Sequence, residues 1–269
     1  MKKMFRTLLT LIFVGGMSYS ISAAVTSGGD VKVVKENLQK ELSDASVQNQ
    51  NVLLVISDKN QTGQEESLAL ANETATLAGN TMVAIVNRDN PEQLTLLQKY
   101  QLSRYPAPYV VILSPDGFIT GGVVPGKMEA TKLSAFVPSP KYNEALKARK
   151  DKKPAFVLIY EKQDGKYTEW MNRLNESASK LTPAAAVIAV SGSDTKETPF
   201  IERLGVKPVA GENILVVLNG SGQVTEKFNT IPEVDALNAS ASKQMTKGCG
   251  SACPSSKSCG GKTSCGETK

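Results

Sequence analysis

Three apolar segments of the chain recur at a nearly constant distance, and this repeat constrains the fold more than any other feature. The first members of the three pairs are residues 52–56, 82–86 and 109–113, and the second members are residues 155–160, 186–190 and 214–218. The offsets are 103, 104 and 105 residues. Each segment is apolar throughout, as buried parallel strands tend to be. We therefore expect two copies of one α/β unit.

Helical patterns separate these strands. Residues 64–79 are rich in Ala, Leu and Glu and end at a glycine, a typical helix stop. Asn90 is placed to cap the next helix, with Pro91 at its first position and Gln93 three residues after the cap. In the second half one helical face carries Trp170, Leu174, Ala178 and Leu181. This spacing favours a core position for the single tryptophan over a ligand platform.

A short turn follows the third strand of each half. The turns are residues 115–117 and 220–222, and they lead into extended stretches at Phe118-Ile119 and Gln223-Val224. A turn of this type followed by extended chain predicts a β-hairpin. Each half thus reads strand, helix, strand, helix, strand, hairpin, strand. Strands that alternate with helices indicate a parallel component, and the hairpin adds an antiparallel pair.

This order of elements resembles the thioredoxin-like fold superfamily. The residues that carry the resemblance are 86–91, 100–113 and Asp116-Gly117. It covers residues 50–137 well and residues 154–235 more weakly. It implies two tandem thioredoxin-like domains, each with a central mixed sheet flanked by helices. It also implies a cis peptide bond before Pro108, which opens the strand 109–113. The alternative is a loop in which Pro106 and Pro108 are both trans.

The reactive cysteines of the resembled family are missing. Their Cys-x-x-Cys follows the first strand and opens a helix, where the helix terminus lowers the thiol pKa. Here that position is filled by residues 57–64 in the first half and 161–167 in the second, without cysteine. The second half has Asn213 where the cis proline is expected. We expect no dithiol exchange by either body domain. The groove beside Ala107 and Pro108 is expected to dock extended peptides, because strand addition needs only main-chain groups.

The chain contains no histidine. This excludes Ser-His and Cys-His nucleophile pairs, histidine-bound zinc and histidine-bound haem. A catalytic role is therefore expected less than a binding role.

The first 24 residues are typical of a secretory signal peptide, with a basic start, a short apolar run and Ala23-Ala24 before the expected cleavage point. An uncleaved interfacial anchor is the alternative. Removal of residues 1–24 deletes three basic residues, which leaves 28 basic and 26 acidic residues and a net charge of +2. We expect an exported protein, in the bacterial periplasm or outside the cell, with no nucleic-acid partner and no stable membrane anchor after cleavage.

The predicted segments follow from these patterns. They are a signal peptide (1–24), a first domain (25–138), a linker (139–153), a divergent second domain (154–242) and a tail (243–269). The linker opens Pro-Ser-Pro and is rich in lysine. We interpret its charges as a solvated linker or a short exposed helix rather than as a binding patch.

All four cysteines lie in the tail, at Cys249, Cys253, Cys259 and Cys265. Residues 248–269 contain no Leu, Ile, Val or Phe, so the segment is expected to be disordered apart from local bridges. Three hypotheses remain open. The cysteines could form two disulfides in an oxidising compartment. They could bind a soft ion, Cu(I) or zinc, as the chain's only cofactor. They could relay electrons to a partner thiol oxidoreductase.

These patterns together predict a non-catalytic binding or scaffold protein with a protein or peptide partner. Its tail would provide disulfide or soft-metal chemistry. The alternative is a thiol-disulfide oxidoreductase, or a redox relay, that uses the tail cysteines.

Overall fold

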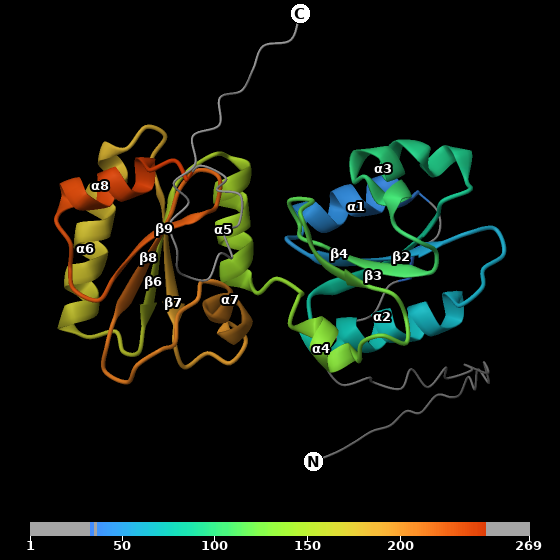
Figure 1. Ribbon diagram of the computed structural model, residues 1–269, viewed down its shortest axis with the longest axis horizontal. Coiled ribbons are helices and arrows are strands. Elements are labelled where there is room, and N and C mark those ends of the chain that lie inside the picture. Colours follow the sequence, from blue (N-terminus) through green and yellow to red (C-terminus); the bar gives the residue numbers. More distant parts are fainter. Residues whose placement is uncertain (1–32, 35–36, 246–269) are drawn as a thin grey trace, which may run out of the picture.

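The structure is a computed structural model that describes residues 33–34 and 37–245. Figure 1 shows two α/β halves joined by a short connection near residue 138. The expected signal peptide (1–24) and the tail cysteines Cys249, Cys253, Cys259 and Cys265 lie outside the described residues.

The first half is a five-stranded mixed sheet with helices on both faces. The strand order is β1-β3-β2-β4-β5; β1 and β2 run parallel to β3, while β4 runs antiparallel to β2 and β5. The elements in chain order are β1 (Val33–Val34), α1 (Leu38–Val47), β2 (Asn51–Ser57), α2 (Gln64–Ala78), β3 (Thr81–Asn87), η1 (Pro91–Gln93), α3 (Leu94–Lys99), η2 (Leu102–Arg104), β4 (Tyr109–Leu113), β5 (Ile119–Val123) and α4 (Ala130–Ser134).

The second half repeats this arrangement without the first strand. Its sheet has the order β7-β6-β8-β9, with β7 parallel and β8 antiparallel to β6. The elements are α5 (Pro140–Lys150), β6 (Ala155–Tyr160), α6 (Gly165–Lys180), β7 (Ala186–Ser191), α7 (Thr198–Arg203), β8 (Ile214–Leu218), β9 (Val224–Phe228) and α8 (Val234–Ser242). The six strands predicted from the apolar repeat are all present, and their ends differ from the prediction by one residue at most.

The central strands are apolar because helices cover both of their faces. On β2, Leu54 and Ile56 face a core shared with α1 and α3, while Leu53 and Val55 face the core under α2 and α4. All four side chains are fully buried. In the second half Trp170, Leu174 and Ala178 of α6 pack on one face of the sheet, which confirms the predicted core position of the tryptophan.

The predicted helix 64–79 is confirmed as α2, but the start of the next helical segment differs from the prediction. Asn90 caps it, since its side-chain oxygen accepts from the amide of Glu92 at 3.0 Å. The side chain of Gln93 instead accepts from the amide of Asn87 at 2.7 Å. A reciprocal capping box therefore does not form, because Gln93 ties the helix start to the end of β3.

The predicted linker 139–153 contains a helix, which was one of its two interpretations, but one face of that helix is buried. Residues 140–150 form α5, whose buried side chains are Asn143, Ala145, Leu146 and Ala148. Ala145 and Ala148 share a core with Ile188 and Val190 of β7. The lysines that suggested a solvated segment occupy the other face of the helix. The segment is thus the first helix of the second half, in the position that α1 has in the first half.

The buried carboxylate of Glu197 fixes the start of α5. It accepts hydrogen bonds from the hydroxyl of Ser139 at 2.5 Å and from the amide of Lys141 at 3.1 Å. Ser139 in turn accepts from the amide of Tyr142 and caps the helix. Free amides at a helix N-terminus favour a carboxylate at this place.

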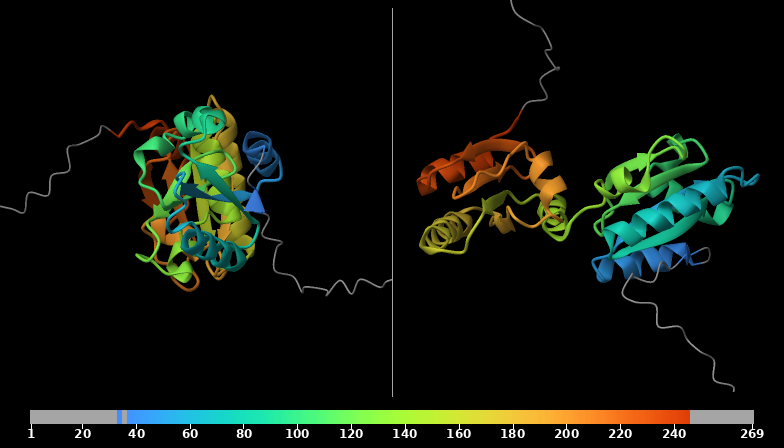
Figure 2. Two further views of the ribbon diagram at one scale, coloured as in Figure 1. Left: turned by 90° about the vertical axis from the view of Figure 1, so that its right-hand side faces the viewer. Right: turned by 90° about the horizontal axis from the view of Figure 1, so that it is seen from below.

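α5 also contacts the first half (Figure 2). The side-chain amide of Asn143 donates to Asn51 at 3.3 Å, and that of Asn51 donates to the carbonyl of Pro138 at 2.9 Å. Lys150 pairs with Asp116 at 2.8 Å. These bonds join the two halves through one helix.

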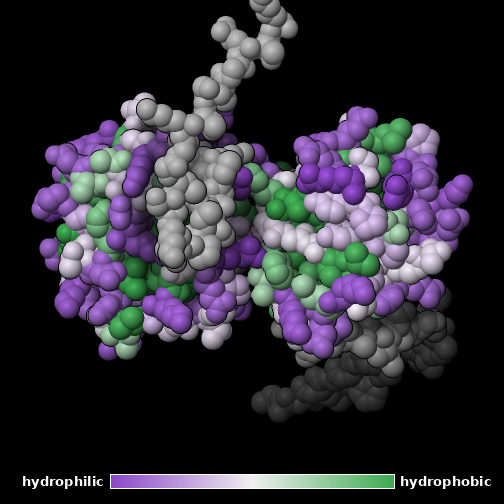
Figure 3. Space-filling view, in the orientation of Figure 1, coloured by the Kyte–Doolittle hydropathy of each residue, from purple (hydrophilic) through white to green (hydrophobic). Residues whose placement is uncertain are grey.

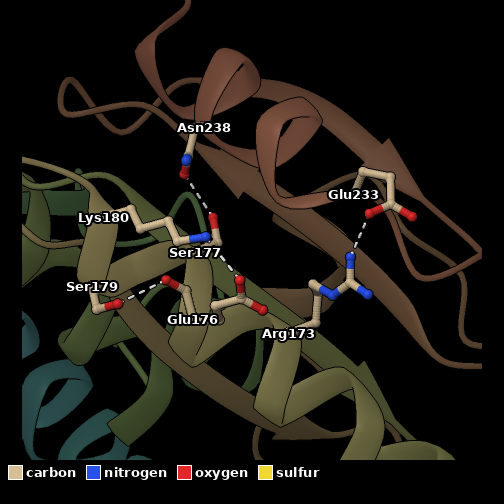
Figure 4. A network of polar contacts seen from close by, with 7 residues as sticks. All are labelled: Arg173, Glu176, Ser177, Ser179, Lys180, Glu233 and Asn238. Atoms are coloured by element: carbon tan, nitrogen blue, oxygen red, sulfur yellow. Dashed lines mark hydrogen bonds and ion pairs between the residues drawn. The ribbon is translucent and has the colours of Figure 1, made fainter.

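The outer face of the second sheet is closed by α6 and α8. Figure 4 shows the polar contacts between and along these helices: the hydroxyl of the fully buried Ser177 donates to Asn238 at 2.7 Å, and Arg173 pairs with Glu233 at 2.7 Å. These contacts fix α8, after which the described chain ends at residue 245.

The chain folds into two tandem thioredoxin-like domains. The strand orders, the helices on both faces and the closing hairpins are those that the resemblance implied. Within the described residues no helix is long and apolar enough to cross a membrane.

Candidate peptide-docking edge

The strand ends around Pro108 lie at the end of the first domain that points away from the second domain (Figure 1), and we call this place the Pro108 edge although β4 itself lies inside the sheet, between β2 and β5. This edge is formed where β2 and β3 end and β4 begins. The peptide bond between Ala107 and Pro108 is cis, as expected. Pro108 leads directly into β4, whose first residue, Tyr109, pairs with Ile56 of β2.

Gly63 packs against the Pro108 ring. Its φ of +70° lies in the left-handed region, and a Cβ on it would lie 2.8 Å from Pro108 Cγ. Real Cβ atoms do not approach that closely, so a glycine is required for both reasons. The start of α2 and Pro108 are therefore in contact.

Hydrogen bonds fix the loop that stands in place of those cysteines. The carboxylate of Asp58 accepts from the amides of Asn60 and Gln61, both at 3.0 Å. The amide of Lys59 donates to Asp89 at 2.8 Å, which ties the loop to the segment after β3. The loop carries no thiol; of its two hydroxyl-bearing residues, Ser57 is buried and Thr62 is exposed.

Two stacked tyrosines support the chain before and after Pro108. The rings of Tyr105 and Tyr109 lie 4.9 Å apart with an interplanar angle of 27°. The guanidinium of Arg104 covers the Tyr105 ring at 5.2 Å. Burial raises the pKa of Tyr109 above its ordinary value of 10.0, and the neighbouring Tyr105 adds to the shift. Tyr109 therefore remains neutral near neutral pH, and its ring packs against that of Tyr105.

The main chain of Ala107 is unpaired among the residues that the structure describes. Neither its N–H nor its C=O makes a hydrogen bond, and the β2–β4 ladder begins two residues later at Tyr109. The residue is half-buried. A free donor and a free acceptor beside a sheet are the groups that strand addition uses.

The second domain differs at the equivalent place. The two cis bonds of the described chain precede Pro108 and Pro183, so Asn213 before β8 has a trans peptide bond, as the sequence predicted. The loop before β8 is held by Glu161, whose carboxylate accepts from the amide of Gly211. A cavity of about 210 Å³ beside it is lined by residues that include Tyr160, Gly192 and Val209. The second domain thus has neither a cis proline nor a thiol at this place.

The structure brings together only part of the predicted site. Ala107 and Pro108 lie side by side at the edge, while Cys249, Cys253, Cys259 and Cys265 are outside the described residues. Within residues 37–245 no group of three or more His, Cys, Asp or Glu side chains could hold a metal ion.

Sequence reasoning missed Gly63 and the tyrosine pair. A glycine directly before a helix is a recognisable signal for a close contact, but its partner is identified only by the fold.

Comparisons with known proteins found similarity to solved structures alone. No protein-family model and no curated protein matches the chain. Among solved structures, it is similar to the bb fragment of ERp72: the match has 18% identity, covers 77% of this chain and 93% of that chain, and has a TM-score of 0.32.

 The thioredoxin from Thermus thermophilus has 19% identity, with 39% of this chain and 84% of that chain covered and a TM-score of 0.31. Form II of ERdj5 has 13% identity and a TM-score of 0.30; the match covers 78% of this chain, which spans 29% of the ERdj5 length. The fold assignment itself comes from the strand order and the geometry around Pro108.

Proposed function

We propose that this protein is an exported, non-catalytic binding or scaffold protein that docks an extended segment of a partner protein at the Pro108 edge. The observation that carries the proposal is the unpaired main chain of Ala107 beside the cis proline, at a sheet edge without a thiol. The edge faces away from the second domain, so a partner can approach it without meeting that domain (Figure 1).

The tail would then supply chemistry to the docked partner. Its four cysteines can form disulfides or bind Cu(I) or zinc, and both uses need only thiolates on an adaptable glycine-rich chain. Neither use needs a residue of the body. In this proposal the two domains bind the partner, and the tail cysteines carry out the chemistry.

Docking is tested with the reduced and carboxymethylated insulin B chain as an extended probe. We expect the probe to slow hydrogen exchange at the Ala107 amide. The substitution Ala107→Pro removes the donor and should weaken binding at least about fivefold. Lys59→Ala is the matched control, because it changes a neighbouring side chain and keeps every main-chain donor. If Ala107→Pro perturbs the circular dichroism spectrum, the test rests on whether the probe slows hydrogen exchange at the Ala107 amide of the unchanged chain. Unprotected Ala107 at saturating probe would refute docking at this edge.

The oxidoreductase alternative is tested by insulin reduction with the full chain and with a chain that ends at Lys243. This end keeps α8 and the hydrogen bond from Asn219 to the Lys243 carbonyl, so the body is retained. The proposal expects no turnover from either chain. Turnover that depends on the tail would replace it with the enzyme. Metal content and a free-thiol count, measured on one sample, separate the disulfide and metal uses of the tail.

A further inference from the structure

The second sheet is one strand shorter than the first. In the first domain the outer side of β3 is paired with β1, through Val33 with Val83 and Val34 with Ala84. The equivalent strand of the second domain is β7, which ends its sheet. No strand in the described part of the chain pairs with the outer side of β7.

The direction of the free groups follows from the hydrogen bonds at both ends of β7. The amide of Ala186 donates to Pro154 and the amide of Gly192 donates to Tyr160, so both point toward β6. Main-chain groups alternate in direction along a strand. The N–H and C=O groups of Val187 and Ala189 therefore point away from β6, to the open side of the sheet.

The two domains can be aligned at this strand through one matching hydrogen bond. The amide of Arg88 donates to Ser57 after β3, as the amide of Gly192 donates to Tyr160 after β7. With this match, Val187 corresponds to Val83, which β1 pairs in the first domain. Ala189 likewise corresponds to Ile85. The open groups of β7 are thus those that a strand occupies in the other copy of the fold.

Burial differs between β3 and β7, as expected if the outer side of β7 is open. Val83 is 0% exposed and Ile85 is 7% exposed, whereas Val187 and Ala189 are only half-buried.

β7 is also an unprotected edge. Edge strands are commonly guarded by charges or proline against pairing with another chain. β9, at the other side of the same sheet, carries Glu226 and Lys227. β7 has the sequence Ala-Val-Ile-Ala-Val-Ser, with no charge and no proline. On the space-filling face in Figure 3 hydrophilic residues dominate the rim of both domains.

We propose that the β7 edge binds an extended segment of another polypeptide, which adds to the sheet as a fifth, parallel strand. β1 (Val33–Val34), which fills the equivalent edge of the first domain, defines the chemistry of this segment: two adjacent β-branched residues, which Lys32 and Lys35 flank in the sequence. The chain's own residues 248–269 are poor candidates, because they contain no Val, Ile, Leu or Phe and strands favour such residues. This surface is separate from the Pro108 edge and does not depend on it.

The test uses a labelled peptide with the sequence of residues 30–36 and the full chain. We expect saturable binding, with slowed hydrogen exchange at the amides of Val187 and Ala189. The substitution Ala189→Pro removes an outward donor and no ladder hydrogen bond, and edge strands tolerate proline at such positions. It should weaken binding at least about tenfold. Ala189→Val keeps the donor and should retain binding.

Each other outcome overturns the proposal. These outcomes are absence of peptide binding and equal affinity in the Ala189→Pro chain. A third is slow hydrogen exchange at the amides of Val187 and Ala189 before peptide is added, because the chain itself would then already cover this edge. Binding of this peptide to the Ala107→Pro chain should be unchanged. That result separates a failure here from a failure of docking at the Pro108 edge.

Discussion

Replacing Gly63 with alanine tests the contact that shapes the candidate edge. Gly63 has a φ of +70°, and an added Cβ would lie 2.8 Å from Pro108 Cγ. The left-handed backbone alone costs alanine about 1–2 kcal/mol. Forcing a methyl group into a packed contact adds about 1–3 kcal/mol. We therefore expect Gly63→Ala to lower the free energy of unfolding by about 2–5 kcal/mol and to weaken peptide docking at Ala107.

A second glycine provides the matched control. Gly211 has a φ of +78°, and a Cβ on it would meet nothing within 4 Å. Gly211→Ala should therefore show the backbone cost of about 1–2 kcal/mol without the clash. Urea unfolding followed by circular dichroism measures both variants. If Gly63→Ala is no more destabilising than Gly211→Ala, the contact between Gly63 and Pro108 does not constrain the edge, and the reasoning fails.

Three further predictions concern the body and its titration. Glu197→Ala should lower the free energy of unfolding by about 1.5–3 kcal/mol, because Ser139 and Lys141 lose a charged acceptor; urea unfolding checks this, and a loss below about 0.5 kcal/mol would contradict it. Leu174→Ala should cost about 2–5 kcal/mol as a fully buried core truncation, against a small effect for the half-exposed Leu77→Ala. The pKa of Tyr109 is raised in the folded state, so above pH 10.0 the folded state binds more protons than the unfolded state. The free energy of unfolding should therefore fall as pH rises from 10.0 through the folded pKa. Tyr109→Phe should remove that part of the decline in alkaline denaturation curves.

The strands were predictable because their signal is local. Residues such as 155–160 are apolar throughout, and only a strand buried on both faces requires that pattern. The hairpins after residues 115–117 and 220–222 were predictable from their turn residues, and they lead into β5 and β9. The cis bond before Pro108 followed from the family resemblance rather than from composition.

α5 could not be identified from its charges. Its four basic residues outnumber its three aliphatic residues, and part of its buried face is polar because Asn143 bonds across to Asn51. A helix whose inner face has one leucine beside two alanines and an asparagine has little hydrophobic periodicity. The contact between Gly63 and Pro108 was hidden for another reason, since it joins residues that only the fold brings together.

The place of α5 also decides where the second domain can be separated from the first. The sequence boundary at residue 154 would remove the helix that covers Ile188 and Val190 on β7. A fragment cut there would expose that apolar face and should aggregate. A fragment that begins at Pro138 keeps the Ser139 cap and its bond to Glu197. The repeated unit of this chain therefore begins with a helix, and β1 is an addition to the first copy alone.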